Sequence, residues 1–180
     1  MGTVLIAYAS RLGSTQEIAT VIADELRQTD HTVTVAPCAT APGAEAFDAV
    51  LIGSALYTGR WLGDATRYLR RQSPHLVDRP TFLFQSGPCG DQQDRPDHPS
   101  VPRAVRATVR RLGLAEPVTF AGRLDPTMIT GRLSRWMASL APACDLRDWE
   151  AIRAWAYGIG LELQERDRRP SPQPPRVAAP

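Results

Sequence analysis

Lysine is missing from this sequence of 180 residues, so all 21 of its Lys and Arg positions are arginine. These guanidinium groups face 19 carboxylates, which leaves a formal net charge of only +2. Such a balance lacks the strongly basic character of nucleic-acid-binding domains, and no nucleic-acid partner is expected. The missing lysine also excludes the phosphate-binding pattern GxxxxGK[ST], and the dinucleotide pattern GxGxxG is absent as well. A nucleoside triphosphate is therefore a disfavoured ligand.

Cysteine and long apolar runs are also scarce. The three cysteines, Cys38, Cys89 and Cys144, form no CxxC pair and have no histidine nearby at metal-ligand spacing. We expect free thiols in a reducing compartment and no metal site. No segment approaches the roughly 20 apolar residues of a membrane span, and the N-terminus lacks a cationic region followed by a long apolar run. These absences favour a cytoplasmic protein.

Charge is unevenly placed along the chain. Carboxylates outnumber arginines in residues 1–60, whereas arginines outnumber carboxylates in residues 101–136. One face or edge of the folded protein is therefore expected to be basic.

Apolar runs and helical periodicity alternate through most of the chain. With 43% apolar and 22% charged residues, the composition is that of one globular domain. Buried strands are expected at residues 3–8, 32–36, 49–52, 81–85 and 118–121, and helices at residues 14–28, 62–71, 100–111, 130–140 and 146–163. Ser14 and Glu17 form a capping-box pattern at the first helix, and Ser100 is the expected cap of the third. This alternation predicts a doubly wound parallel sheet covered by helices on both faces.

The first strand–helix turn carries hydroxyl groups and a glycine. In "VLIAYASRLGSTQEIATVIADEL" the turn holds Ser10, Gly13, Ser14 and Thr15. A helix N-terminus presents unpaired N–H groups and suits a phosphate, and the hydroxyls add donors, with Arg11 nearby. The turn predicts a cup for a terminal monophosphate. The alternative is that Ser14 only caps the helix and the other hydroxyls are ordinary turn residues.

Two further loops follow strands of the same predicted sheet. "GSALYTGRW" brings Tyr57 and Trp61 to a strand end, where flat rings suit stacking on an aromatic ligand. "QSGPCGD" exposes backbone that can hydrogen-bond a planar heterocycle. Carboxyl ends of parallel strands share one edge, where such sheets bind ligands, so a phosphorylated planar cofactor is indicated. In the alternative, Trp61 begins the next helix and packs in the core, and Tyr57 is an ordinary surface tyrosine.

These motifs resemble the flavodoxin-like FMN proteins over about residues 3–165. "SRLGST" is similar to the family's phosphate loop, although Leu12 stands where many members carry another hydroxyl, and "GSALYTGRW" is similar to the loop that flanks the flavin. "AGRLDP", an inserted segment and "DWEAIRAWA" resemble more specifically the menaquinone-dependent protoporphyrinogen IX dehydrogenases. The resemblance implies a flavodoxin-like five-stranded parallel sheet in the order 2-1-3-4-5, with a helical insert before the last helix.

The resemblance also implies FMN as cofactor and assigns its binding to the three loops. The expected cofactor-binding residues are Ser10, Arg11, Leu12, Gly13, Ser14, Thr15, Ser54, Ala55, Leu56, Tyr57, Thr58, Gly59, Ser86, Gly87, Pro88, Cys89, Gly90 and Asp91. No catalytic residue is assigned, because the flavin itself performs the redox chemistry. Asp91 and His98 are candidates for a proton relay, and Cys89 for a redox role, with ordinary solvated or structural roles as the alternative.

Three functions fit this reading. An electron-carrier flavodoxin normally uses an acidic surface to reach a redox partner protein, whereas this chain is slightly basic. We therefore favour an oxidoreductase passing electrons from a porphyrinogen-like or other small substrate to a quinone. A flavin-free binding module is the third reading.

The insert and the tail complete the predicted organisation. Residues 128–141 carry an apolar stripe flanked by arginines, which either packs on the domain or touches the inner face of a membrane. Residues 1–165 are expected to form the domain, and residues 166–180 a proline-rich disordered tail.

Overall fold

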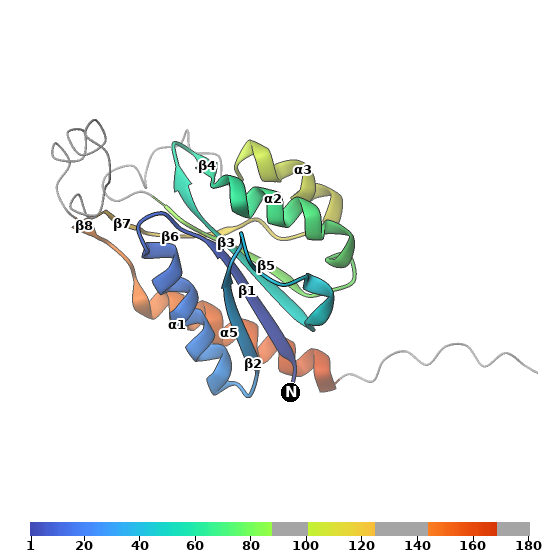
Figure 1. The fold of residues 1–180 in the computed structure, drawn as a ribbon. Coiled ribbons are helices and arrows are strands. Elements are labelled where there is room, and N and C mark those ends of the chain that lie inside the picture. The colour runs from blue at the N-terminus through green and yellow to red at the C-terminus, as the bar shows by residue number, and fades with distance from the viewer. Residues whose placement is uncertain (88–100, 125–143, 169–180) are drawn as a thin grey trace, which may run out of the picture.

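Five parallel strands form the centre of the protein. The computed structural model describes residues 1–87, 101–124 and 144–168. The parallel strands are β1 (Thr3–Ala9), β2 (Thr32–Pro37), β3 (Ala49–Tyr57), β5 (Thr81–Ser86) and β6 (Val118–Phe120). They pair in the order β2-β1-β3-β5-β6 (Figure 1). Without the short hairpin strand β4, this is the expected order 2-1-3-4-5, and the fold prediction is confirmed.

Helices cover both faces of the sheet. α1 (Ser14–Gln28) and α5 (Trp149–Arg168) lie together on one face, and α2 (Gly63–Gln72) and α3 (Arg103–Leu112) lie together on the other (Figure 1). Two short 3₁₀ helices, η1 (Ala44–Ala46) and η2 (Ser73–His75), lie in the connections.

Two apolar cores flank the sheet because successive strand residues point to opposite faces. In β1, Leu5 and Ala7 pack in the core beneath α2 and α3, whereas Val4 and Ile6 pack in the core beneath α1 and α5. Strands buried on both faces explain the near-continuous apolar runs of the sequence.

β3 is longer than expected. It continues past Ile52 to Tyr57, and a turn at Thr58 and Gly59 folds the chain back into β4 (Arg60–Trp61). Thr58 has φ 51° and Gly59 has φ 69°, the positive pair of a two-residue hairpin turn. A β-hairpin therefore stands where a loop was expected.

A short antiparallel pair of strands precedes α5. β7 (Arg123–Leu124) and β8 (Cys144–Asp145) pair antiparallel and bring together the two ends of segment 125–143. The helix expected at residues 130–140 lies in this segment, outside the described residues.

Both capping predictions are wrong. The N-cap of α1 is Gly13, which makes Ser14 the first helical residue, and no side chain of the described residues caps this end. α3 begins at Arg103 with Pro102 at its N-cap, because a residue that precedes proline is driven out of the helical conformation and Val101 cannot extend the helix. Ser100 is outside the described residues.

The prediction of three free thiols is also wrong. Cys38 is free and buried, but Cys144 is disulfide-bonded. Sequence spacing does not reveal which cysteines approach each other in the folded chain. α5 also runs to Arg168, so residues 166–168 of the expected tail are helical, while residues 169–180 are not described. Within the described ranges, no helix is both long and apolar enough to cross a bilayer.

Candidate functional site

The three predicted loops meet at one edge of the sheet. The guanidinium carbon of Arg11, in the first loop, lies 5.2 Å from the ring centroid of Tyr57, in the second. The buried hydroxyls of Thr15 and Ser86 lie 2.7 Å apart, which joins the first loop to the third. The loops after β1, β3 and β5 therefore form one site, as the strand order requires.

The first loop presents backbone donors. Gly13 has φ 83°, and a Cβ placed there would have only Glu17 Oε1 within 4 Å, at 3.8 Å, so the space beside it is open. The Glu17 N–H donates to Gly13 O at 3.0 Å. The N–H groups of Ser14, Thr15 and Gln16 have no acceptor among the residues that the structure describes. Free N–H groups and the positive end of the helix dipole suit an anion.

The hydroxyls of this loop have different roles. Ser14 Oγ accepts the Arg123 N–H at 3.2 Å, and Thr15 is fully buried against Ser86. Ser10 and Leu12 are partly exposed. Two of the three predicted hydroxyl donors thus bind other parts of the protein. The backbone N–H groups at the start of α1 and the Ser10 hydroxyl are left to bind a ligand.

Arginines that the sequence analysis missed neutralise the acidic side chain of the first turn. Arg147, whose side chain is 4% exposed, reaches Glu17 at 2.5 Å, and Arg123 reaches it at 3.4 Å. Arg147 also binds Asp145 at 2.5 Å, a hydrogen bond that holds the pKa of the Asp145 carboxyl below its usual value. Both contacts to Glu17 join residues more than a hundred positions apart, and no local pattern signals them.

The second loop is a β-hairpin with an aromatic ring, Tyr57, next to its turn. Ser54 is buried, donates to Ala55 O and accepts the Leu62 N–H, both at 3.0 Å, so Ser54 and Ala55 hold the hairpin together. Leu56, Tyr57 and Gly59 are partly exposed and Thr58 is exposed. Burial raises the pKa of Tyr57, and Arg11 opposes that shift.

Trp61 belongs to the core. It is 5% exposed and donates its indole N–H to Gln85 at 2.8 Å. The core position given to Trp61 in the alternative interpretation is therefore confirmed, but its place at the start of a helix is wrong, because Trp61 lies in β4 and α2 begins at Gly63. Tyr57 is the ring of this loop that is left to contact a ligand.

Only the start of the third loop is described. Ser86 is buried, and the Gly87 N–H donates to Phe120 O at 2.7 Å. A Cβ on Gly122 would lie 2.2 Å from Gly87 O, so the chain after β6 passes close to this loop. The other predicted residues of the loop lie outside the described residues: Pro88, Cys89, Gly90, Asp91 and His98.

A cavity of about 480 Å³ adjoins the first loop, between the ends of β1 and β2 and the start of α2. It is lined in part by Ser10, Arg11, Asp64 and Arg67. No group of three or more His, Cys, Asp or Glu residues in the described part of the chain is arranged to hold a metal ion.

Comparison with known proteins shows the family to which this arrangement of strands and loops belongs. The family model of the flavodoxin domain matches residues 5–131. No curated protein matches the chain in sequence. Among solved structures, a flavodoxin from the domain Archaea superposes with a TM-score of 0.62 at 12% identity, over 90% of this chain and 99% of that one.

Two further structures show the same fold. Oxidised flavodoxin 2 from Bacillus cereus has a TM-score of 0.55 at 18% identity, covering 91% of this chain and 99% of its own. The rubredoxin oxygen:oxidoreductase of Desulfovibrio gigas has a TM-score of 0.58 at 17% identity, and 93% of this chain matches 37% of that longer protein.

The flavodoxin domain family points to FMN as the cofactor, and the residues present fit it. The uncapped start of α1 and the open space beside Gly13 suit its phosphate, and the partly exposed Tyr57 suits its ring. The chain belongs to the flavodoxin domain family.

Proposed function

We propose that the protein is an FMN-dependent oxidoreductase that takes two electrons and two protons from a porphyrinogen-like or other small substrate and delivers them to a quinone. The observation that carries the flavin assignment is the meeting of the three loops through the Arg11–Tyr57 and Thr15–Ser86 contacts. Bound FMN supplies one- or two-electron transfer.

The chain's own residues bind and orient the cofactor. The free N–H groups at the start of α1 would hold the phosphate without a lysine, and Arg123 and Arg147 offset the nearby Glu17 carboxylate. Tyr57, held at the hairpin tip, would lie against the ring. The hydrogen bond between Thr15 and Ser86 attaches the start of α1 to the end of β5, which fixes the position of the first loop relative to the third.

Charge favours a small-molecule oxidoreductase over a protein-docking carrier. Carrier flavodoxins depend on an acidic surface, whereas α2 and α3 here carry seven arginines, Arg67, Arg70, Arg71, Arg103, Arg106, Arg110 and Arg111, and only Asp64 as a carboxylate. An electron carrier serving a redox partner protein remains the second candidate, since single-domain flavodoxins are matched over 99% of their length.

The first test is flavin binding. The purified protein is expected to absorb at about 450 nm and to rebind FMN saturably after the flavin is removed. Gly13→Ala, which forces a strained positive φ onto alanine, is expected to weaken FMN binding about tenfold or more. Gly113→Ala is the matched control, because Gly113 has φ 62° at the end of α3 with nothing near its Cβ. Equal FMN affinity of both variants would contradict the role of the Gly13 turn in holding the phosphate, whereas no FMN complex at all would favour the flavin-free binding module.

The second test separates enzyme from carrier. Direct turnover of a porphyrinogen with a soluble naphthoquinone as acceptor is expected for the proposed oxidoreductase. Turnover that requires both a reductase and a protein acceptor would instead establish the carrier.

Membrane contact through residues 128–141 forms part of the same proposal, with the protein at the inner face of a membrane. Replacement of these residues by a short linker is expected to abolish flotation with liposomes. Unchanged flotation would remove residues 128–141 as the membrane contact, and a wild-type protein that does not float would remove the membrane from the proposal. Either result leaves the flavin site unaffected.

A further inference from the structure

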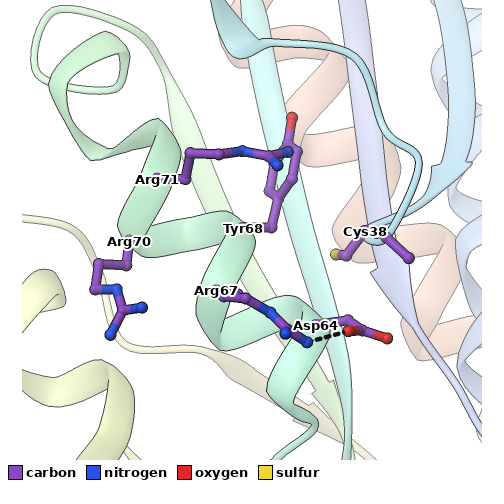
Figure 2. A pocket seen from close by; sticks show the side chains of 7 residues that line it. Cys38, Asp64, Arg67, Tyr68, Arg70 and Arg71 are labelled. Atoms are coloured by element: carbon purple, nitrogen blue, oxygen red, sulfur yellow. Dashed lines mark hydrogen bonds and ion pairs between the residues drawn. The ribbon is translucent and has the colours of Figure 1, made fainter.

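A second cavity lies beside the flavin site, between the chain after β2 and helix α2. It has a volume of about 610 Å³ and is lined by Cys38, Ala39, Asp64, Arg67, Tyr68, Arg70 and Arg71. We call it the α2 groove. Figure 2 shows Cys38 on one side and the side chains of α2 on the other. A volume of this size suits a small molecule.

The α2 groove continues towards the flavin site. The 480 Å³ cavity beside the first loop shares Cys38, Ala39, Asp64 and Arg67 with it. A molecule held in the groove can therefore extend to Ser10 and Arg11 of the first loop.

Positive charge dominates the groove. Arg67 is paired with Asp64 at 2.5 Å, and Asp64 is the only carboxylate in the described lining. The Arg71 guanidinium lies 5.4 Å from the Tyr68 ring centroid and has no hydrogen bond or ion pair within the described chain. Arg70 extends away from Cys38 (Figure 2). The nearby carboxylate of Glu45 lies 4.0 Å from His75 Nε2, so its ion-pair partner is His75 and not an arginine of the groove.

The floor of the groove supplies no anion of its own. Burial raises the pKa of the Cys38 thiol to about 12, so it stays protonated at neutral pH. Burial likewise raises the pKa of Tyr68 to about 12, and its hydroxyl donates to Pro42 O at 2.6 Å. The arginines thus line a cavity whose floor, Cys38 and Tyr68, is uncharged. Asp64 alone does not balance their positive charge.

We propose that the α2 groove binds the carboxylates of a small polycarboxylate, with Arg71 and Arg67 as the binding groups. Planar guanidinium groups match carboxylates through paired hydrogen bonds, and Tyr68 holds the Arg71 side chain in place beneath such a ligand. The ligand is an electron donor or acceptor of the neighbouring flavin site, and for this redox role the inference rests on the proposed function. Binding itself requires no flavin.

The probe is citrate, titrated by calorimetry into the full-length protein with and without FMN. Citrate is expected to bind in both forms, more weakly as salt is raised. Arg71→Gln is expected to weaken citrate binding about tenfold. Asp64→Asn, which releases Arg67 from its partner, is expected to strengthen it. Arg110→Gln is the matched control, since Arg110 occupies the last turn of α3 as Arg71 does in α2.

The outcomes separate the alternatives. No citrate binding by the wild type, or equal loss in Arg71→Gln and Arg110→Gln, would overturn the proposal. Inorganic phosphate binding as tightly as citrate would overturn the carboxylate assignment. If Arg71→Gln fails to fold, Asp64→Asn still tests the proposal, because this variant is expected to bind citrate more tightly than the wild type. Citrate binding by a protein that takes up no FMN would support the groove and refute the proposed function.

Discussion

At the scale of single residues, Thr15 links the two ends of the site. Its side chain is fully buried, and its hydroxyl and that of Ser86 satisfy each other across the sheet edge. Thr15→Val preserves the shape but leaves the Ser86 hydroxyl unpaired, so the free energy of unfolding should fall by about 1–3 kcal/mol, measured by urea denaturation. Thr20→Val, on the exposed face of the same helix, should change it by less than about 0.5 kcal/mol. Equal losses would contradict a structural role for the Thr15–Ser86 contact.

Cys38 is a residue whose burial determines its chemistry. Because its pKa is raised from 9.0 to about 12, its thiol is not the reactive thiolate near neutral pH. Iodoacetamide at about pH 8 should therefore leave Cys38 unmodified in the folded protein and alkylate it in urea, as peptide mapping would show. Rapid alkylation of Cys38 without urea would show that the thiol is exposed.

The same shift gives a pH dependence of stability. Above pH 9.0 the unfolded chain loses the Cys38 proton while the folded protein keeps it. The unfolded state then binds fewer protons, so stability present below pH 9.0 is lost as pH rises towards about 12. Cys38→Ala should show a smaller loss over this range in denaturation at a series of pH values.

At the scale of elements, the β7–β8 strand pair is attached to the first turn of α1 by charge. Arg147 bridges Glu17 and Asp145, and its guanidinium carbon lies 4.3 Å from the Trp149 ring centroid. Arg147→Met leaves the Glu17 carboxylate less neutralised beside the phosphate position. FMN affinity should fall about two- to fivefold, the effect of one charge at a helix terminus, as measured by flavin fluorescence titration.

A double variant tests the cause of this effect. Arg147→Met with Glu17→Gln should recover the affinity, because the unbalanced carboxylate is gone. If the double variant binds FMN as weakly as Arg147→Met alone, the loss comes from displacement of the β7–β8 strand pair rather than from charge.

At the scale of the whole molecule, one sheet joins two cores. Ile22 of α1 and Leu69 of α2 lie on opposite faces, and both are almost completely buried. Ile22→Ala and Leu69→Ala should each lower the free energy of unfolding by about 2–5 kcal/mol. Neighbouring residues of each strand belong to different cores, so both variants should unfold in one transition by circular dichroism and fluorescence. Val77→Ala, at a side chain 61% exposed, should be nearly neutral.

The sequence by itself determined the order of strands and helices and the edge at which the site lies. Those features follow from local patterns: apolar runs, helical periodicity, and small residues after strands. The β3–β4 hairpin was not predicted, because threonine at a positive φ is uncommon and Thr58 therefore does not indicate this type of turn.

Only the tertiary structure decided which side chains meet. Glu17 with Arg147, Thr15 with Ser86, and Trp61 with Gln85 join residues far apart in the chain. The α2 groove likewise needs Cys38 after β2 to face Arg71 on α2. A sequence pattern reports each element's own periodicity, whereas these contacts depend on how the elements pack around the sheet.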